Sequence, residues 1–171
     1  MNRRWPKGLY LLMAAAAGAY FRHYYPLLPN IMASHFDARG IPNGWSTKQA
    51  FFEIFAWMTV LAAVLVFGVP KIIAVTPRQL INLPNKEYWL GSEHRAATME
   101  FLSGWFAWFG CAVYAVIVVA FDYAVQNTLH GHDGANPMRL WYMLALFGVF
   151  ILTWTIRLFG RFGRVPGSPS S

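Results

Sequence analysis

Four long apolar segments constrain this chain more than any other feature of its sequence. A helix needs about 20 mainly apolar residues to cross a hydrocarbon core of ~30 Å, because each residue adds ~1.5 Å. The sequence therefore predicts an all-α membrane protein with four transmembrane helices, in a single domain over residues 1–164 with a flexible tail over residues 165–171. The expected spans are residues 8–28, 50–69, 101–121 and 140–156.

The composition agrees with a lipid environment. Hydrophobic residues make up 57% of the chain and charged residues only 12%, against about 25% charged residues in a soluble domain. Aromatic residues make up 18%, as expected where amphipathic rings gather at two membrane–water interfaces. The net charge of +7 lies mostly beside the apolar segments, which favours the lipid bilayer as the partner and argues against nucleic acid.

Short motifs predict where the helices begin and end. Polar side chains at a helix start bind its unpaired N–H groups, and proline is suited to the first helical position. If the third helix begins near Glu93, it projects well beyond the membrane on its N-terminal side. The predicted boundaries are a capping box of Ser46 and Gln49 before the second helix, an end at Pro70 and Lys71, a start at Ser92 and Glu93 for the third, and Asn136 with Pro137 for the fourth.

Basic residues predict the orientation, because Lys and Arg gather in cytoplasmic segments. One side has Arg3, Arg4, Lys7, Lys71, Arg78, Lys86, Arg95, Arg157, Arg161 and Arg164. The other side has only Arg22, Arg39, Lys48 and Arg139. Both termini and the loop over residues 71–100 are therefore expected in the cytoplasm, while the loops over residues 29–49 and 122–139 face outward.

The apolar segments carry no ionisable residue near their centres. Glu53 and Asp122 lie at the outer ends of the expected spans, and Glu100 and Arg157 lie at the inner ends. Proton relays and ion-coupled transporters use buried carboxylates or histidines, so the sequence argues against transport. The single cysteine, Cys111, is expected to pack as a small residue within the third segment.

The outer loop, residues 29–49, carries the most specific pattern. Asp37 to Gly40 suits a type I turn with Asp first and Gly fourth, and residues 42–44 suit a second turn. We expect a compact cap over the outer ends of the first two helices. The side chains expected against this cap, or at the start of the second helix, are His35, Phe36 and Trp45.

A spaced pattern runs through the same loop. Its residues are Leu28, Pro29, His35, Phe36, Gly40, Pro42, Gly44, Trp45 and Lys48. This pattern resembles the bacterial membrane family called domain of unknown function 1648, which also forms the N-terminal part of Sdp-type toxin-immunity proteins. The resemblance covers the first two helices and their loop, and it implies their fold and a location in the bacterial cytoplasmic (inner) membrane.

Residues 2–19 allow two interpretations. They combine basic residues, an apolar run and the triplet Ala17-Gly18-Ala19, as in a secretory signal peptide with its cleavage site. Alternatively, they belong to a retained anchor. The resemblance implies the anchor, because the Leu28-Pro29 pattern follows a retained helix in related proteins.

A histidine-rich turn precedes the fourth segment. His130, His132 and Asp133 offer two imidazoles and a carboxylate, a set that can bind Zn²⁺ or Cu²⁺ at the outer face. Gly-rich turns of the same composition also occur without a metal, and we favour that interpretation, with no cofactor. His35 has no second ligand at helical spacing, so we expect it to bond within its loop.

Two cytoplasmic segments are candidates for contacts. Tyr88 and Trp89 could dock a partner or anchor the loop at the lipid headgroups. The basic end of the fourth helix could bind anionic lipid, at about 1 kcal/mol per basic residue. The loop motif is Asn82, Pro84, Asn85, Tyr88 and Trp89, and the basic residues are Arg157, Arg161 and Arg164.

The sequence carries no enzyme signature. It lacks a Gly-rich phosphate loop, a G-x-S-x-G elbow and an H-E-x-x-H motif. We therefore expect a non-catalytic inner-membrane protein, a sensor, immunity-like or regulatory factor, with the outer loop as its recognition surface. The alternatives are an accessory structural subunit bound to another membrane protein and, third, a small membrane metalloenzyme that uses the outer histidines.

Overall fold

A computed structural model describes residues 4–131 and 136–165. The chain is mainly helical, with one two-stranded antiparallel sheet in the described part. The elements are α1 (Arg4–Tyr24), the 3₁₀ turn η1 (Tyr25–Leu27), β1 (Ile31–Phe36), β2 (Pro42–Thr47), α2 (Lys48–Ala63), the π-helical turn η2 (Val64–Gly68), α3 (Val69–Val75), the 3₁₀ turn η3 (Arg78–Leu80), α4 (Lys86–Trp89), α5 (Arg95–His130) and α6 (Met138–Phe162).

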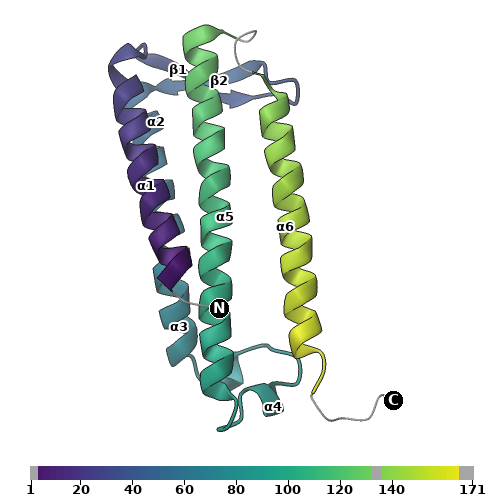
Figure 1. Cartoon of the computed structure of the whole chain (residues 1–171). Coiled ribbons are helices and arrows are strands. Elements are labelled where there is room, and N and C mark those ends of the chain that lie inside the picture. The colour runs from purple at the N-terminus through teal and green to yellow at the C-terminus, as the bar shows by residue number, and fades with distance from the viewer. Residues whose placement is uncertain (1–3, 132–135, 166–171) are drawn as a thin grey trace.

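The long helices run alternately up and down along one axis (Figure 1). The β1–β2 hairpin lies across one end of the molecule, which we call the hairpin end, and α4 lies at the opposite α4 end. α1 begins and α6 ends on the side away from the hairpin. α5 is the longest helix, and α1 and α6 lie on either side of it in this view.

Three helices of the described chain are long and apolar enough to cross a membrane, namely Lys48–Val75, Arg95–His130 and Met138–Phe162. The expected first span is also helical, with 21 residues in α1. It falls outside this group because its apolar part is rich in alanine and is bounded by Lys7 at one end and by Arg22 and His23 at the other. By length and composition, these three helices are suited to crossing a membrane.

The second helix does not stop at Pro70 as predicted, but continues to Val75. Proline has no N–H group to donate within a helix. The chain accommodates this with the π-helical turn η2, in which the N–H of Val69 donates to the carbonyl of Val64. The helix ends at Val75, and the hydroxyl of its C-cap residue, Thr76, donates to the carbonyl of Ile72.

The predicted helix starts are each close to the observed ones. The N-cap of α2 is Thr47, not Ser46, since the N–H of Ala50 donates to Thr47 Oγ1 over 3.2 Å. α5 begins at Arg95, after the predicted start at residues 92–93. α6 begins at Met138 with Pro137 as its N-cap, one position after the predicted start, and the N–H of Met138 donates to the side chain of Asn136 over 2.9 Å.

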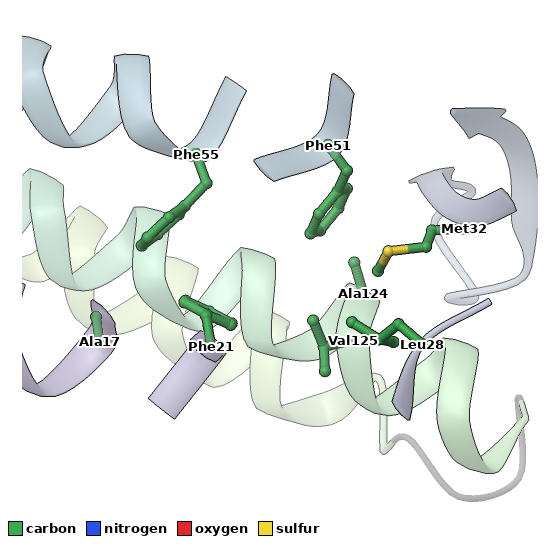
Figure 2. Close-up of a cluster of buried hydrophobic side chains, with 8 residues drawn as sticks. All are labelled: Ala17, Phe21, Leu28, Met32, Phe51, Phe55, Ala124 and Val125. Atoms are coloured by element: carbon green, nitrogen blue, oxygen red, sulfur yellow. The ribbon is translucent and has the colours of Figure 1, made fainter. Parts of the chain in front are cut away.

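The hydrophobic core extends into the hairpin. The eight buried residues of its largest cluster come from α1, α2, α5 and the hairpin segment (Figure 2). Met32 of β1 is fully buried and lies with Leu28 beside Ala124 and Val125 of α5. The hairpin is therefore part of the same packed body as the helices.

The middle of the bundle is closely packed where α5 meets η2. Tyr114, Ala62 and Val66 are fully buried there. The predicted packing role of Cys111 is confirmed, because its buried thiol lies in this cluster and donates to the carbonyl of Pro6 over 3.1 Å.

Gly110 makes this close approach feasible, and its substitution provides a test of the packing. A Cβ atom at Gly110 would lie 2.6 Å from Val66 Cγ2, so Gly110→Ala should lower the free energy of unfolding by about 1–3 kcal/mol. Gly148→Ala on α6 is the control, since nothing lies within 4 Å of its Cβ position. It should be neutral or stabilise by about 0.5–1 kcal/mol. Denaturation in detergent micelles measures both, and equal effects would contradict the packing.

Candidate functional site

The residues of the predicted cap form a β-hairpin with two irregularities. β1 and β2 pair from Ile31 opposite Thr47 to Phe36 opposite Pro42, and the register shifts on either side of His35. The second predicted turn, at residues 42–44, is wrong, because these residues belong to β2. Gly44 lies opposite His35, where a Cβ atom would come within 3.0 Å of the histidine side chain.

The first predicted turn is confirmed. The N–H of Gly40 donates to the carbonyl of Asp37 over 2.9 Å. The Asp37 carboxylate accepts from the backbone N–H groups of Arg39 and Ile41 over 2.8 and 2.9 Å. The bond from Ile41, together with that from Arg39, holds the pKa of Asp37 below its ordinary value. The turn is thus fixed by its own side chain.

This turn is docked on α5 and on the start of α6. The hydroxyl of Tyr123 donates to the carbonyl of Gly40 over 3.1 Å. The indole N–H of Trp141 donates to the carbonyl of Ala38 over 3.2 Å. Gly40 has a φ of +79°, and a Cβ atom there would lie 2.3 Å from the Tyr123 hydroxyl. Only glycine fits this position without strain.

Lys48 closes the loop at its other end. Its ammonium group donates to the carbonyls of Leu28 and Tyr25 over 2.9 and 3.2 Å and lies 4.7 Å from the centroid of the Tyr25 ring. Its backbone N–H donates to the carbonyl of Asn30 over 2.8 Å. The first and last residues of the loop pattern therefore bind each other and join the end of η1 to the start of α2.

Several side chains of the hairpin are exposed on the surface of the protein. Trp45 is 63% exposed, and Ile31 and Ile41 are 55% and 41% exposed. His35 is exposed and lies 3.0 Å, Nδ1 to Oγ, from its neighbour Ser34, so the expectation that it lies against the cap is wrong. Phe36 does pack inward, with its ring 5.0 Å from that of Tyr123.

A polar cluster that the sequence reasoning missed lies near the hairpin end. Asp122 on α5 accepts from the Tyr20 hydroxyl of α1 over 2.5 Å and from Arg139 of α6 over 3.0 Å. Gln126 donates to the Tyr20 hydroxyl over 2.8 Å. The side chain of Asp122 is 14% exposed and that of Arg139 is 57% exposed. A signal for this cluster was available, because an acid beside a long apolar segment requires a partner.

An apolar groove begins at this cluster. One part, of 540 Å³, lies between α1 and α5, and the other, of 560 Å³, lies between α5 and α6. The two parts share Ala115, Val119 and Arg139 in their linings, so they adjoin. This arrangement places an ion pair at one end of an apolar surface, a combination that matches the chemistry of an amphiphilic molecule.

The predicted cytoplasmic motif binds the end of α6. The side-chain amide of Asn85, which adopts a φ of 50°, and the indole N–H of Trp89 both donate to the carbonyl of Phe162, over 2.9 and 3.3 Å. Tyr88 lies against the ring of His94, with 4.2 Å between centroids. Asn82 is exposed and Pro84 is half-buried. Trp89 therefore binds the end of α6 within the protein, a contact that the sequence analysis did not predict.

Basic residues lie on both sides of the same helix end, with Arg157 and Arg161 in the last turns of α6 and Arg164 just after it. The Arg161 guanidinium lies 4.1 Å from the centroid of the Phe101 ring, a cation–π contact. Arg157 and Arg164 are exposed.

Of the predicted metal ligands, the structure describes His130 alone, exposed at the last position of α5. His132 and Asp133 lie outside the described residues. Within residues 4–131 and 136–165, no three His, Cys, Asp or Glu side chains form a group that could hold a metal ion. The hypothesis about the histidine-rich turn stays a prediction.

Gly40 provides a test of how the turn is held. Gly40→Ala should loosen the hairpin, through both the strained φ and the clash with Tyr123, at a cost of about 1–3 kcal/mol. Gly131→Ala is the control, because Gly131 also has a positive φ, of 75°, with nothing within 4 Å of its Cβ position. The hydrogen-exchange rate of the hairpin amides should rise for Gly40→Ala and stay unchanged for Gly131→Ala. If both variants change this rate equally, the contact with Tyr123 does not hold the turn in place.

Comparison with known proteins identifies one part of the chain. No curated protein and no solved structure matches it. Residues 11–61 match the family model described as Domain of unknown function (DUF1648). This match runs from α1 through the hairpin into α2 and contains the pattern from Leu28 to Lys48. The resemblance is therefore confirmed for residues 11–61, which are similar to the DUF1648 domain of unknown function.

Proposed function

We propose that the protein crosses the bacterial cytoplasmic membrane four times, with α1 as the additional span and both termini in the cytoplasm. α1 has 21 residues, about 31 Å of helix, which is enough for a hydrocarbon core of ~30 Å. Its residues Tyr10, Ala17 and Phe21 are buried against the apolar helices. The distribution of Lys and Arg supports the orientation, and Arg157, Arg161 and Arg164 would then meet anionic lipid at the inner surface.

Labelling of introduced cysteines tests this topology. In a Cys111→Ala background, Asn43→Cys in β2 should react with a membrane-impermeant maleimide in intact cells, because Asn43 is exposed on the hairpin. Asn82→Cys, exposed near the α4 end, should react only after the cells are opened. Reaction of Asn82→Cys in intact cells, or fusion reporters that place the two termini in opposite compartments, would overturn the proposal.

For its activity we propose non-catalytic recognition at the outer face, as a sensor, immunity-like or regulatory factor. The observation that carries this proposal is the exposed Trp45, 63% accessible, on a hairpin whose turn and both ends are fixed. Exposed tryptophan on a rigid support is typical of residues that dominate binding energy at interfaces. Ile31 and Ile41 extend the apolar surface around it. The hairpin would meet its ligand without the cost of first becoming ordered.

Substitution of Trp45 tests this role. Trp45→Ala should leave the free energy of unfolding within about 0.5 kcal/mol of the wild type, because the side chain is exposed. Cells that carry it should nevertheless become as sensitive to a secreted toxin or envelope stress as cells that lack the protein. Trp57→Ala is the matched control, since Trp57 is 71% exposed on α2, away from the hairpin. An unchanged phenotype of the deletion across a broad challenge panel would contradict the proposal.

The second candidate is an accessory subunit of a larger membrane complex. It is favoured by α6, whose most apolar stretch has no buried residue and which exposes Leu146, Val149 and Leu152. A partner helix could cover this surface. A stoichiometric partner that stays bound in mild detergent would support the subunit role, and a monodisperse single protein would count against it.

A further inference from the structure

We propose that the groove beside α5 binds one phospholipid of the outer leaflet, with its phosphate at Arg139 and its acyl chains along the apolar lining. The inference rests on the membrane placement given under Proposed function, but it does not depend on recognition by the hairpin. It assigns a ligand to a surface that the hairpin does not form.

One face of α5 forms the floor of the groove. Ala112, Ala115, Val116 and Val119 follow the spacing of residues that share a helix face, and all four line the groove. Two of them are alanines, which leaves room above the helix. α1 forms one wall with Met13 and Ala16, and α6 forms the other with Met143, Leu146 and Phe147.

The length of the groove matches one leaflet. Ten residues separate Asp122, at its polar end, from Ala112, which is about 15 Å along the helix. This is half of a hydrocarbon core of ~30 Å. Farther toward the α4 end, the ring of Trp154 lies 5.2 Å from that of Phe109 and is stacked on Trp105 at 5.8 Å, and these two tryptophans line a separate, smaller hollow of 200 Å³. The two larger parts of the groove, from Asp122 to Ala112, therefore have the length of a lipid in one leaflet.

The polar end of the groove can receive a phosphate. The Asp122 carboxylate is already bound by Tyr20 and Arg139, so the ion pair has no net charge. Within the described residues, the Arg139 guanidinium makes a single hydrogen bond, to Asp122, out of five N–H donors. Its side chain is 57% exposed and lines both parts of the groove. The remaining donors are suited to phosphate oxygens.

Native mass spectrometry of the purified full chain tests the site, with phosphatidylglycerol as the probe. Arg139→Gln should weaken binding about tenfold or more, as expected for the loss of charge-assisted hydrogen bonds. Ala115→Leu should also weaken it, because the larger side chain fills the floor of the groove. Val119→Phe also places a larger side chain in the groove and replaces Ala115→Leu if that variant does not fold. Thermal unfolding shows whether each variant is folded. Arg39→Gln is the control, because it removes the same charge from an 81% exposed side chain of the hairpin turn.

One further variant and two further ligands identify the chemistry that the site recognises. Asp122→Asn should leave binding unchanged or tighter, because it removes a carboxylate that competes for Arg139. Diacylglycerol, which has no phosphate, should bind about tenfold more weakly, and inorganic phosphate should not displace the lipid. Equal binding of diacylglycerol, displacement by phosphate alone, or loss in Asp122→Asn without loss in Arg139→Gln would each overturn the assignment.

Two outcomes separate this inference from the membrane topology. If Arg139→Gln, Ala115→Leu and Val119→Phe all bind phosphatidylglycerol as tightly as the wild type, the lipid site is overturned. The result of the cysteine labelling would still stand in that case. A protein that alkaline carbonate extracts from membranes would overturn the topology itself, whatever the binding measured in detergent.

Discussion

The packing of every long element against α5 is the constraint on which this structure depends. α1, α2, α3, β1 and α6 all contact this helix. Its 36 residues span about 54 Å, which is longer than a ~30 Å hydrocarbon core. Because α5 extends beyond the core, Tyr123 can hold the hairpin turn at one end, while Phe101 lies under Arg161 near the other.

The loop pattern within the segment that matches the DUF1648 domain separates into two groups of residues. Leu28, Gly40 and Lys48 serve the fold, since they enter the core, allow the docked turn and close the loop. Trp45 and His35 are exposed and contribute little to the packing. The pattern in this loop thus contains some residues that form the hairpin and others that the hairpin exposes on the protein surface.

Much of the fold could be predicted from local sequence, because helices depend on nearby residues and on apolar length. The Asp37–Gly40 turn and the start of α6 within one position of Pro137 followed from local rules. The extension beyond Pro70 could not be foreseen, since the π-helical turn that permits it depends on packing against α5. The hairpin was missed because each strand has only six residues and β2 begins with Pro42, Asn43 and Gly44, residues that are typical of a turn.

The candidate site was harder to predict than the helices. Tyr20 and Asp122 lie 102 positions apart, and no pattern in a single sequence links them. The same is true of Trp89 and Phe162, which are 73 positions apart. Contacts of this range are set by how the helices are arranged, so the groove and its ion pair emerged only with the structure.

The attachment of α6 has a mechanical consequence. The helix is tied to the rest of the protein by Trp141 at the hairpin turn, by Trp154 on Trp105 and by the carbonyl of Phe162. The 12 residues between the first two ties form one wall of the groove and span about 18 Å. Because α6 is held at both ends of this stretch, a slight bend between Trp141 and Trp154 would change the width of the groove. The contacts of the two tryptophans would stay in place.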